Sequence, residues 1–326
     1  MPGYAVQATD LHKSYPTGRG KEPVHALDGL SFAVEPGTVF GLLGPNGAGK
    51  STTVKILSTL TRPDAGTATV AGADVAADPD AVRRRIGLVS QKPSSDPMAT
   101  GRENLVLAAR IQGLSKASAH ERAQWLLDRF GIADAADRLV KTWSGGMARK
   151  LDVAIGLVHR PQVLFLDEPT TGLDPEARTE MWAEIDRMAG DDGMTVLLTT
   201  HYLDEADRLA GRLAIVEHGR VAVEGTPDEL KAELRGDVLQ VELESEDAAA
   251  RATARIELVD GLSAVLRDGA VVRARTGAGA RVVPAVFALL GDAGIPVVSA
   301  TVARPSLDDV YLRYAGRSFQ VEEVAA

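Results

Sequence analysis

The sequence predicts an α/β domain built on a parallel sheet, followed by a smaller α+β domain. Two features predict the first domain. The segment GPNGAGKST, residues 44–52, lies between the apolar runs GTVFGLL and STTVKIL, and the apolar run VLFL is followed by Asp167 and Glu168. Such runs are typical of buried parallel strands, whose carboxyl ends carry the ligand chemistry of open α/β sheets. After residue 236 the pattern becomes strand, helix, strand, strand, helix and strand, the order of a ferredoxin-like unit.

Residues 44–52 fit the phosphate-binding pattern G-x-x-x-x-G-K-[ST]. The glycines of such a loop let successive backbone N–H groups turn toward phosphate oxygens, and the following helix adds its positive end. The loop consists of Gly44, Pro45, Asn46, Gly47, Ala48, Gly49, Lys50, Ser51 and Thr52. Lys50 is placed to reach the β- and γ-phosphates of a nucleotide. The pattern therefore predicts a P-loop NTPase core.

The pair Asp167 and Glu168 suits the chemistry of a magnesium nucleotide. The Ser51 hydroxyl and the Asp167 carboxylate are oxygen ligands of the kind that Mg²⁺ prefers. Glu168, one residue later, points elsewhere and is free to orient or deprotonate an attacking water, so hydrolysis is the expected reaction. A solvated turn at a strand end is the alternative, but it gives no reason for the matching phosphate loop.

A second anion site is predicted in the segment WSGGM, residues 143–147. Ser144, Gly145 and Gly146 open a predicted helix through ARKLDVAIGLVHR, so a hydroxyl and several N–H groups lie at its positive end. A plain helix N-cap is the alternative interpretation.

These segments, together with LFLDEP, GLDP and the TTH that ends at His201, resemble the ATPase subunit of an ABC transporter over about residues 4–230. The commonest form of the second anion site in that family is LSGGQ; here Trp143 and Met147 replace its Leu and Gln, and SGGM occurs in one branch. The resemblance implies ATP and Mg²⁺ as cofactors. It also implies an ATP-dependent homodimer in which the SGGM segment completes the ATP pocket of the opposite subunit.

The resemblance assigns roles to single residues. Catalytic roles fall to Lys50, Glu168, His201 and Gln91, and Mg²⁺ ligands are expected at Ser51, Gln91 and Asp167. Gln91, expected to close the strand IGLVSQ, would also face a membrane partner. Tyr15 would stack on adenine, Asp174 would link the two ATP sites, and His201 would contact the γ-phosphate. From residue chemistry alone, Tyr15 is more often a core or rim residue, and His201 could as easily be structural.

The expected organisation is a nucleotide-binding domain at residues 1–230, an accessory α+β domain at residues 236–316 and a tail at residues 317–326. Within the first domain, residues 92–160 predict a helical subdomain, and residues 92–113 are expected near a permease. Thr100 with Glu103, and Ser306 with Asp309, fit capping boxes that begin helices. The accessory domain and its final LDDV helix resemble the daunorubicin-resistance type of bacterial exporter.

Composition limits the possible functions. The chain of 326 residues has no cysteine, which excludes disulfides and thiolate metal sites. It shows neither a signal-peptide pattern nor an apolar stretch approaching 18 residues, so a transporter needs a separate, polytopic membrane permease. The chain would then be peripheral, at the cytoplasmic face of the plasma (inner) membrane. A net charge of −9 argues against a broad nucleic-acid-binding surface.

The predicted function is therefore ATP hydrolysis that drives export of a drug, antibiotic or lipid. One alternative is a soluble ABC-type ATPase that acts on the ribosome or DNA without a permease. Only about 90 residues without sustained heptads separate Lys50 from Ser144, and the chain holds a single cassette, which disfavours that class. A protein that binds ATP without hydrolysing it is disfavoured by the intact Glu168 and His201.

Overall fold

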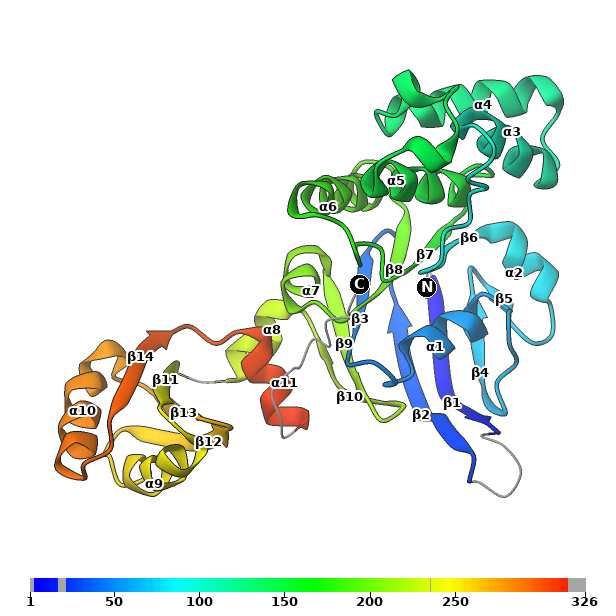
Figure 1. The fold of residues 1–326 in the computed structure, drawn as a ribbon. Coiled ribbons are helices and arrows are strands. Elements are labelled where there is room, and N and C mark those ends of the chain that lie inside the picture. Colours follow the sequence, from blue (N-terminus) through cyan, green and yellow to red (C-terminus); the bar gives the residue numbers. More distant parts are fainter. Residues whose placement is uncertain (1–2, 17–21, 235, 316–326) are drawn as a thin grey trace. The chain divides into compact units, whose positions relative to one another are not determined.

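The computed structural model describes residues 3–16, 22–234 and 236–315 (Figure 1). These residues form two compact units that divide between Thr226 and Pro227. The predicted tail, residues 317–326, lies outside the described residues. Within the described ranges, no helix has the length and apolar character needed to cross a membrane.

A six-stranded, mainly parallel sheet forms the centre of the first unit. Its strand order is β10-β9-β3-β8-β7-β6, and β10 alone runs antiparallel to its neighbour. The strands are β3 (Val39–Leu43), β6 (Ile86–Val89), β7 (Val163–Asp167), β8 (Thr195–Thr200), β9 (Arg212–Glu217) and β10 (Arg220–Gly225). Strands β3 and β8 are buried along their whole length, as uninterrupted apolar runs predict. The predicted α/β core is confirmed.

The two faces of this sheet are covered by different layers. On β7, Val163 and Phe165 pack toward α1 and an antiparallel sheet of order β2-β1-β4-β5, whereas Leu164 and Leu166 pack toward a layer of helices. Alternate residues of a strand point to opposite faces, so a strand buried on both sides must be apolar throughout. The first layer consists of α1 (Lys50–Leu57), β1 (Val6–Tyr15), β2 (Val24–Val34), β4 (Ala65–Val70), β5 (Ala73–Asp74) and α2 (Pro79–Arg85).

The helical layer contains α3 (Gly101–Ile111), α4 (Lys116–Arg129), α5 (Gly145–Gly156), α6 (Pro175–Gly190) and α7 (Leu203–Leu209), with short 3₁₀ turns η1 (Ala133–Ala135) and η2 (Val140–Thr142). The predicted capping box begins α3: the Glu103 N–H donates to Thr100 Oγ1 at 3.1 Å, and the Thr100 N–H donates to Glu103 Oε2 at 2.8 Å. Helix α5 ends at Gly156, so the prediction that it continues through LVHR was wrong. A residue before proline avoids the helical region, and Arg160, before Pro161, has a φ of 58°.

The second unit confirms the ferredoxin-like prediction. A four-stranded antiparallel sheet has the order β12-β13-β11-β14. One of its faces packs against α9 and α10 in a separate apolar core. Its elements are α8 (Pro227–Glu233), β11 (Asp237–Leu243), α9 (Glu246–Ile256), β12 (Leu262–Asp268), β13 (Val271–Thr276), η3 (Gly279–Val282), α10 (Val283–Asp292), β14 (Val297–Ala303) and α11 (Leu307–Ala315). Ser306 and Asp309 form the predicted reciprocal cap of α11.

The helical layer approaches the central sheet closely where α5 crosses β6. A Cβ atom placed on Gly87 would lie 2.3 Å from the Gly156 carbonyl oxygen. Neither backbone is free to yield, because Gly87 pairs with Leu164 in the sheet and Gly156 belongs to the last turn of α5. The position of α5 therefore depends on two facing glycines.

We expect Gly87→Ala to lower the free energy of unfolding by about 1–3 kcal/mol, the usual cost of overpacking a core. The measurement is chemical denaturation of the purified chain. Gly190→Ala is the matched control, because an added Cβ there meets nothing within 4 Å. Equal stability of Gly87→Ala and the control would contradict this account of the packing.

Candidate nucleotide-binding and catalytic site

The phosphate loop connects the buried strand β3 to α1. Gly47 and Gly49 have φ values of 80° and 109°, in the left-handed region that favours glycine. A Cβ on Gly49 would also lie 2.6 Å from the Ala26 carbonyl oxygen. The glycine spacing of the motif is therefore a requirement of the backbone path, which leads directly into the helix N-terminus.

Lys50, the first residue of α1, lies folded back over the loop. Its side chain is 4% exposed, and its Nζ donates to the carbonyl oxygens of Gly44 at 2.7 Å and Pro45 at 3.1 Å. The same ammonium lies 3.8 Å from Glu168 Oε1. Burial lowers the pKa of Lys50, and the nearby carboxylates of Glu168 and Asp167 oppose that effect. The site thus holds a buried cation beside the loop that the sequence assigns to phosphate.

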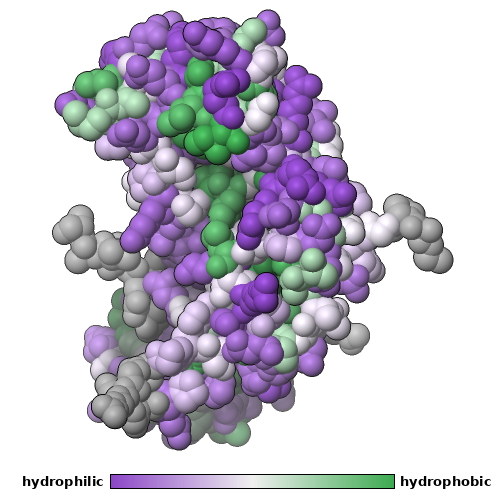
Figure 2. Space-filling view, turned by 90° about the vertical axis from the view of Figure 1, so that its right-hand side faces the viewer, coloured by the Kyte–Doolittle hydropathy of each residue, from purple (hydrophilic) through white to green (hydrophobic). Residues whose placement is uncertain are grey.

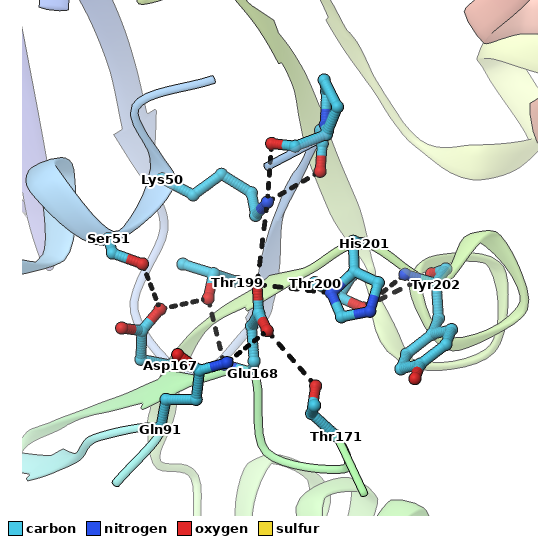
Figure 3. Close-up of polar contacts among 12 residues, drawn as sticks. Lys50, Ser51, Gln91, Asp167, Glu168, Thr171, Thr199, Thr200, His201 and Tyr202 are labelled. Atoms are coloured by element: carbon cyan, nitrogen blue, oxygen red, sulfur yellow. Dashed lines mark hydrogen bonds and ion pairs between the residues drawn. The ribbon is translucent and has the colours of Figure 1, made fainter. Parts of the chain in front are cut away.

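Asp167, the last residue of β7, lies beside the start of α1 (Figure 3). Its Oδ1 accepts from Ser51 Oγ at 3.1 Å and from Thr199 Oγ1 at 2.6 Å. The structure therefore brings together the two oxygen donors that the sequence assigned to Mg²⁺. Hard oxygen donors of this kind suit Mg²⁺. Among the described residues, no group of three or more His, Cys, Asp or Glu side chains could hold a metal by itself.

Glu168 follows β7 with a φ of 49°, an uncommon conformation for a residue other than glycine. Its N–H donates to Thr199 Oγ1 at 3.0 Å. Its carboxylate accepts from Gln91 Nε2 at 3.2 Å and Thr171 Oγ1 at 3.3 Å, and lies 3.3 Å from His201 Nδ1. That last approach is a close contact, which is an ion pair only when His201 is protonated.

The electrostatic balance at Glu168 favours the carboxylate. Burial by itself would raise the pKa of Glu168, but His201, Lys50 and Thr171 together outweigh burial and lower it. Glu168 is therefore ionised at neutral pH and can accept a proton or a hydrogen bond.

Gln91 was predicted to close a strand, and that detail was wrong, because β6 ends at Val89. The last residue of β6 pairs with Leu166 of β7. The carbonyl of Ser90 instead accepts a hydrogen bond from Arg149 Nη1 at 2.7 Å, so the chain leaves the sheet. Gln91 nevertheless reaches Glu168, as the close-up in Figure 3 shows.

The residues assigned to the opposite ATP pocket form a second group. Ser144 and Asp174 are the N-caps of α5 and α6, accepting from the backbone N–H groups of Met147 at 3.2 Å and Ala177 at 2.9 Å. A Cβ on Gly146 would lie 2.8 Å from the Ala177 side chain, so the two helix starts are neighbours. Ser144 and Gly145 are exposed. This group shares no hydrogen bond or ion pair with the Lys50 and Glu168 cluster within the described chain.

Tyr15, at the end of β1, is also separate from the cluster. The centre of its ring lies 5.6 Å from Lys13 Nζ, and its side chain makes no hydrogen bond with another described residue. The geometry therefore does not test the expected stacking on adenine.

Three contributors to the site were not expected from the sequence. Thr199 and Thr171 bind the two carboxylates, and Arg149 binds the backbone around them. The double threonine before His201 was the available signal for Thr199, since a polar residue within a buried strand needs a partner. Nothing in the local pattern distinguishes Arg149 from other helical arginines.

Comparison with known proteins identifies the family. Residues 27–171 match the ABC transporter family, and residues 225–315 match the C-terminal domain of DrrA1-3-like ATP-binding proteins. The daunorubicin/doxorubicin resistance ATP-binding protein DrrA of Streptomyces peucetius is 48% identical over 97% of this chain and 94% of its own length. The Nod factor export ATP-binding protein I of Burkholderia thailandensis is 41% identical over 90% of this chain and 93% of its own length.

A solved structure gives the corresponding fold. A dimeric ATP-binding cassette in a post-hydrolysis state, bound to ADP and Pi, matches with a TM-score of 0.62 and 26% identity, over 68% of this chain and 98% of that one. The phosphate loop, Asp167 and Glu168 lie in the family-matched region. The chain therefore belongs to the ATP-binding proteins of ABC transporters, in the branch of the daunorubicin/doxorubicin-resistance proteins, and is an ATPase that binds and hydrolyses ATP.

Proposed function

We propose that two copies of this chain close around two MgATP molecules and drive a separate polytopic permease at the cytoplasmic face of the plasma (inner) membrane. The cargo that fits the branch is a drug, an antibiotic or a lipid. The observation that carries the proposal is the convergence of Lys50, Asp167 and Glu168 at one edge of the sheet. That edge is where parallel α/β sheets place their ligand chemistry.

In the proposed reaction, the loop amides and Lys50 hold the β- and γ-phosphates. A water oxygen bonds to the γ-phosphorus, the bond to the bridging oxygen breaks, and Glu168 accepts the proton of the water. Gln91 and His201 flank that carboxylate and orient it. Ser51, Asp167 and Gln91 would hold Mg²⁺, which supplies charge neutralisation when bound.

The charge of Lys50 couples the basicity of Glu168 to the presence of nucleotide. The Lys50 charge lowers the pKa of Glu168 and so weakens that carboxylate as a base. When phosphate oxygens share the Lys50 charge, the pull on Glu168 falls and its basicity rises. The base is thus strengthened by the presence of the substrate on which it acts.

We expect Glu168→Gln to lower turnover by about two to four powers of ten, because a general base contributes about that much. Nucleotide binding should persist, since the amide keeps the volume of the side chain. Steady-state ATPase assays and nucleotide titrations measure the two effects. Exposed Glu121→Gln on α4 serves as the control with the same charge change. Turnover within threefold of the unaltered protein would remove Glu168 from the proposed role.

The dimer proposal explains why the site is in two groups. Ser144, Gly145 and Gly146 offer a hydroxyl and N–H groups at an exposed helix N-terminus, which attracts anions. Asp174 begins the neighbouring helix α6. A nucleotide held by Lys50 of one copy would meet these groups from the other copy. The dimeric solved relative bound to ADP and Pi supports this arrangement.

We expect Ser144→Arg to leave nucleotide binding by the monomer intact and to abolish ATP-dependent dimerisation, because the larger, charged side chain blocks the surface. Size-exclusion chromatography with and without MgATP, in the Glu168→Gln background, measures this. Ser115→Arg is the matched control, because Ser115 is also an exposed N-cap, that of α4. This variant loses a similar helix cap but leaves the proposed dimer interface unchanged. Loss of monomer binding by Ser144→Arg would argue against a role in the opposite pocket.

The helical layer carries an apolar surface suited to the permease. Met98, Leu107 and Ile111 are 63%, 60% and 75% exposed. In Figure 2, apolar side chains gather in the upper part of the molecule, where α3 and α4 lie. Leu107 and Ile111 are one helical turn apart on α3, so they share one face. The part of the chain that carries these three side chains, residues 98–111, follows Gln91 closely in the sequence. It therefore connects this surface to the catalytic residues.

We expect tagged Glu168→Gln protein, purified from gently solubilised membranes of its host in MgATP, to retain a stoichiometric polytopic membrane protein. Mass spectrometry identifies the partner. Adding Leu107→Glu and Ile111→Glu should remove it, whereas Leu258→Glu, an equally exposed leucine of the second unit, should not. Ribosomal or DNA-bound partners without a membrane protein would overturn the transporter proposal, and equal loss with Leu258→Glu would overturn the assigned surface.

A further inference from the structure

Arg149 lies on α5, five residues after Ser144, and is only 8% exposed. Its guanidinium donates to four backbone carbonyls from two separate segments. Nη1 donates to Ser90 at 2.7 Å, and Nε donates to Pro169 at 2.8 Å. Nη2 is shared between the carbonyls of Asp167 and Glu168, at 3.2 Å each. The side chain therefore joins the segment before Gln91 to the segment that carries the catalytic carboxylates.

Burying the Arg149 guanidinium costs free energy of desolvation. Within the described chain, no carboxylate forms an ion pair with Arg149, and its direct partners are backbone carbonyls. Burial lowers the pKa of Arg149, and Asp152, Asp167 and Glu205 oppose that effect from a distance. A buried charge without an ionic partner costs free energy that an apolar side chain of similar volume would avoid. The planar, five-donor fork is what only arginine supplies.

The two segments that Arg149 joins must keep a fixed spacing. Gln91 Nε2 lies 3.2 Å from Glu168 Oε2, and Gln91 follows directly after Ser90. Glu168 has the left-handed φ of 49°, a conformation that persists only where the surroundings hold it. Thr199 fixes the N–H of Glu168, and Arg149 fixes its carbonyl. The guanidinium therefore controls both the distance between the two side chains and the direction of the carboxylate.

We propose that Arg149 is a positioning residue for ATP hydrolysis, which holds the backbone of Ser90 and of residues 167–169 so that Gln91 and Glu168 meet at the reacting water. The inference rests on the proposed role of Glu168 as the base. Arg149 touches no reacting group and acts through the backbone of Glu168. Its loss should therefore change the rate of the chemical step and leave nucleotide binding at the phosphate loop unchanged.

The test compares Arg149→Lys with the unaltered chain. Lysine keeps the charge but cannot span two segments with a planar fork. We expect kcat to fall by about 10- to 100-fold, the effect of a displacement near 1 Å at a catalytic group, with KM and nucleotide affinity within about twofold. Guanidinium ion at low concentration should partly restore kcat in Arg149→Ala, because it can occupy the space of the missing fork.

Arg122→Lys is the matched control. Arg122 also lacks an ion pair in the described chain and donates to the carbonyls of Leu157 at 2.7 Å and Val158 at 3.2 Å, just beyond the other end of α5. Burial lowers the pKa of both arginines, that of Arg122 to about 10, so each guanidinium is held partly out of water. The control should lose stability and keep its kcat. An equal fall of kcat in both variants would overturn the inference, since it would show a general effect of packing around α5.

A double-mutant cycle with Glu168→Gln separates this inference from the proposed function. If Arg149 acts through Glu168, Arg149→Lys should lower kcat little further once Glu168 is replaced. Additive losses, or a kcat of Arg149→Lys within twofold of the unaltered chain, would overturn the inference while the low turnover of Glu168→Gln still stands. If Glu168→Gln keeps its turnover, the proposed role of Glu168 as the base is wrong, and the inference on Arg149 falls with it. Arg149→Gln is the second variant, and failure of both variants to fold would indicate a purely structural role.

Discussion

The catalytic arrangement depends on the carboxylate of Glu168 staying charged in a buried place. Burial alone would raise its pKa, and the contacts with His201, Lys50 and Thr171 outweigh that effect and lower it. Each of these partners comes from a different segment, so the balance exists only when the phosphate loop, the end of β8 and the residues after β7 are all in place. The fold of the first unit thus sets the charged surroundings in which the Glu168 carboxylate is buried.

Helix α5 is the rigid element that connects this centre to the surface. Its N-cap is the exposed Ser144, its middle carries Arg149, and its end meets β6 at the facing glycines Gly87 and Gly156. One turn from Arg149, Asp152 Oδ1 accepts from the backbone N–H groups of Ser94 and Ser95 at 2.9 and 3.0 Å. Through Arg149 and Asp152 the helix therefore holds the chain on both sides of Gln91, and through Arg149 it also holds the carbonyl of Glu168.

Much of this could be predicted from the sequence because the signals are local. The glycine spacing of the phosphate loop, the apolar run ending at Asp167 and the capping boxes at Thr100 and Ser306 each express a backbone requirement within a few residues. The order of strands and helices along the second unit followed from its sequence pattern, and it predicted the ferredoxin-like fold. These elements were found where local chemistry indicated, and the errors were at the ends of one strand and one helix.

The remaining features could not be predicted, because they depend on which distant segments meet. Arg149 reads as an ordinary helical arginine until α5 is packed against β6 and β7. Thr199 lies in an apolar strand, and only the order of β7 and β8 in the sheet turns its hydroxyl toward Asp167. The close contact of Gly87 with Gly156 likewise has no periodic signature. Contacts between side chains on neighbouring strands depend on how the sheet is assembled, and one sequence does not show which strands are neighbours.

The division of the site also bears on how the protein uses binding energy. Lys50, Asp167 and Glu168 lie at the carboxyl ends of the strands, while Ser144 caps the start of α5 and Asp174 caps the start of the neighbouring α6. In the proposed dimer, a nucleotide held by the first group would meet the second group only when another copy arrives. Under the proposed function, hydrolysis removes the phosphate that both copies share. The interaction that holds the dimer closed is then destroyed by the reaction that closure permits, which makes the cycle directional.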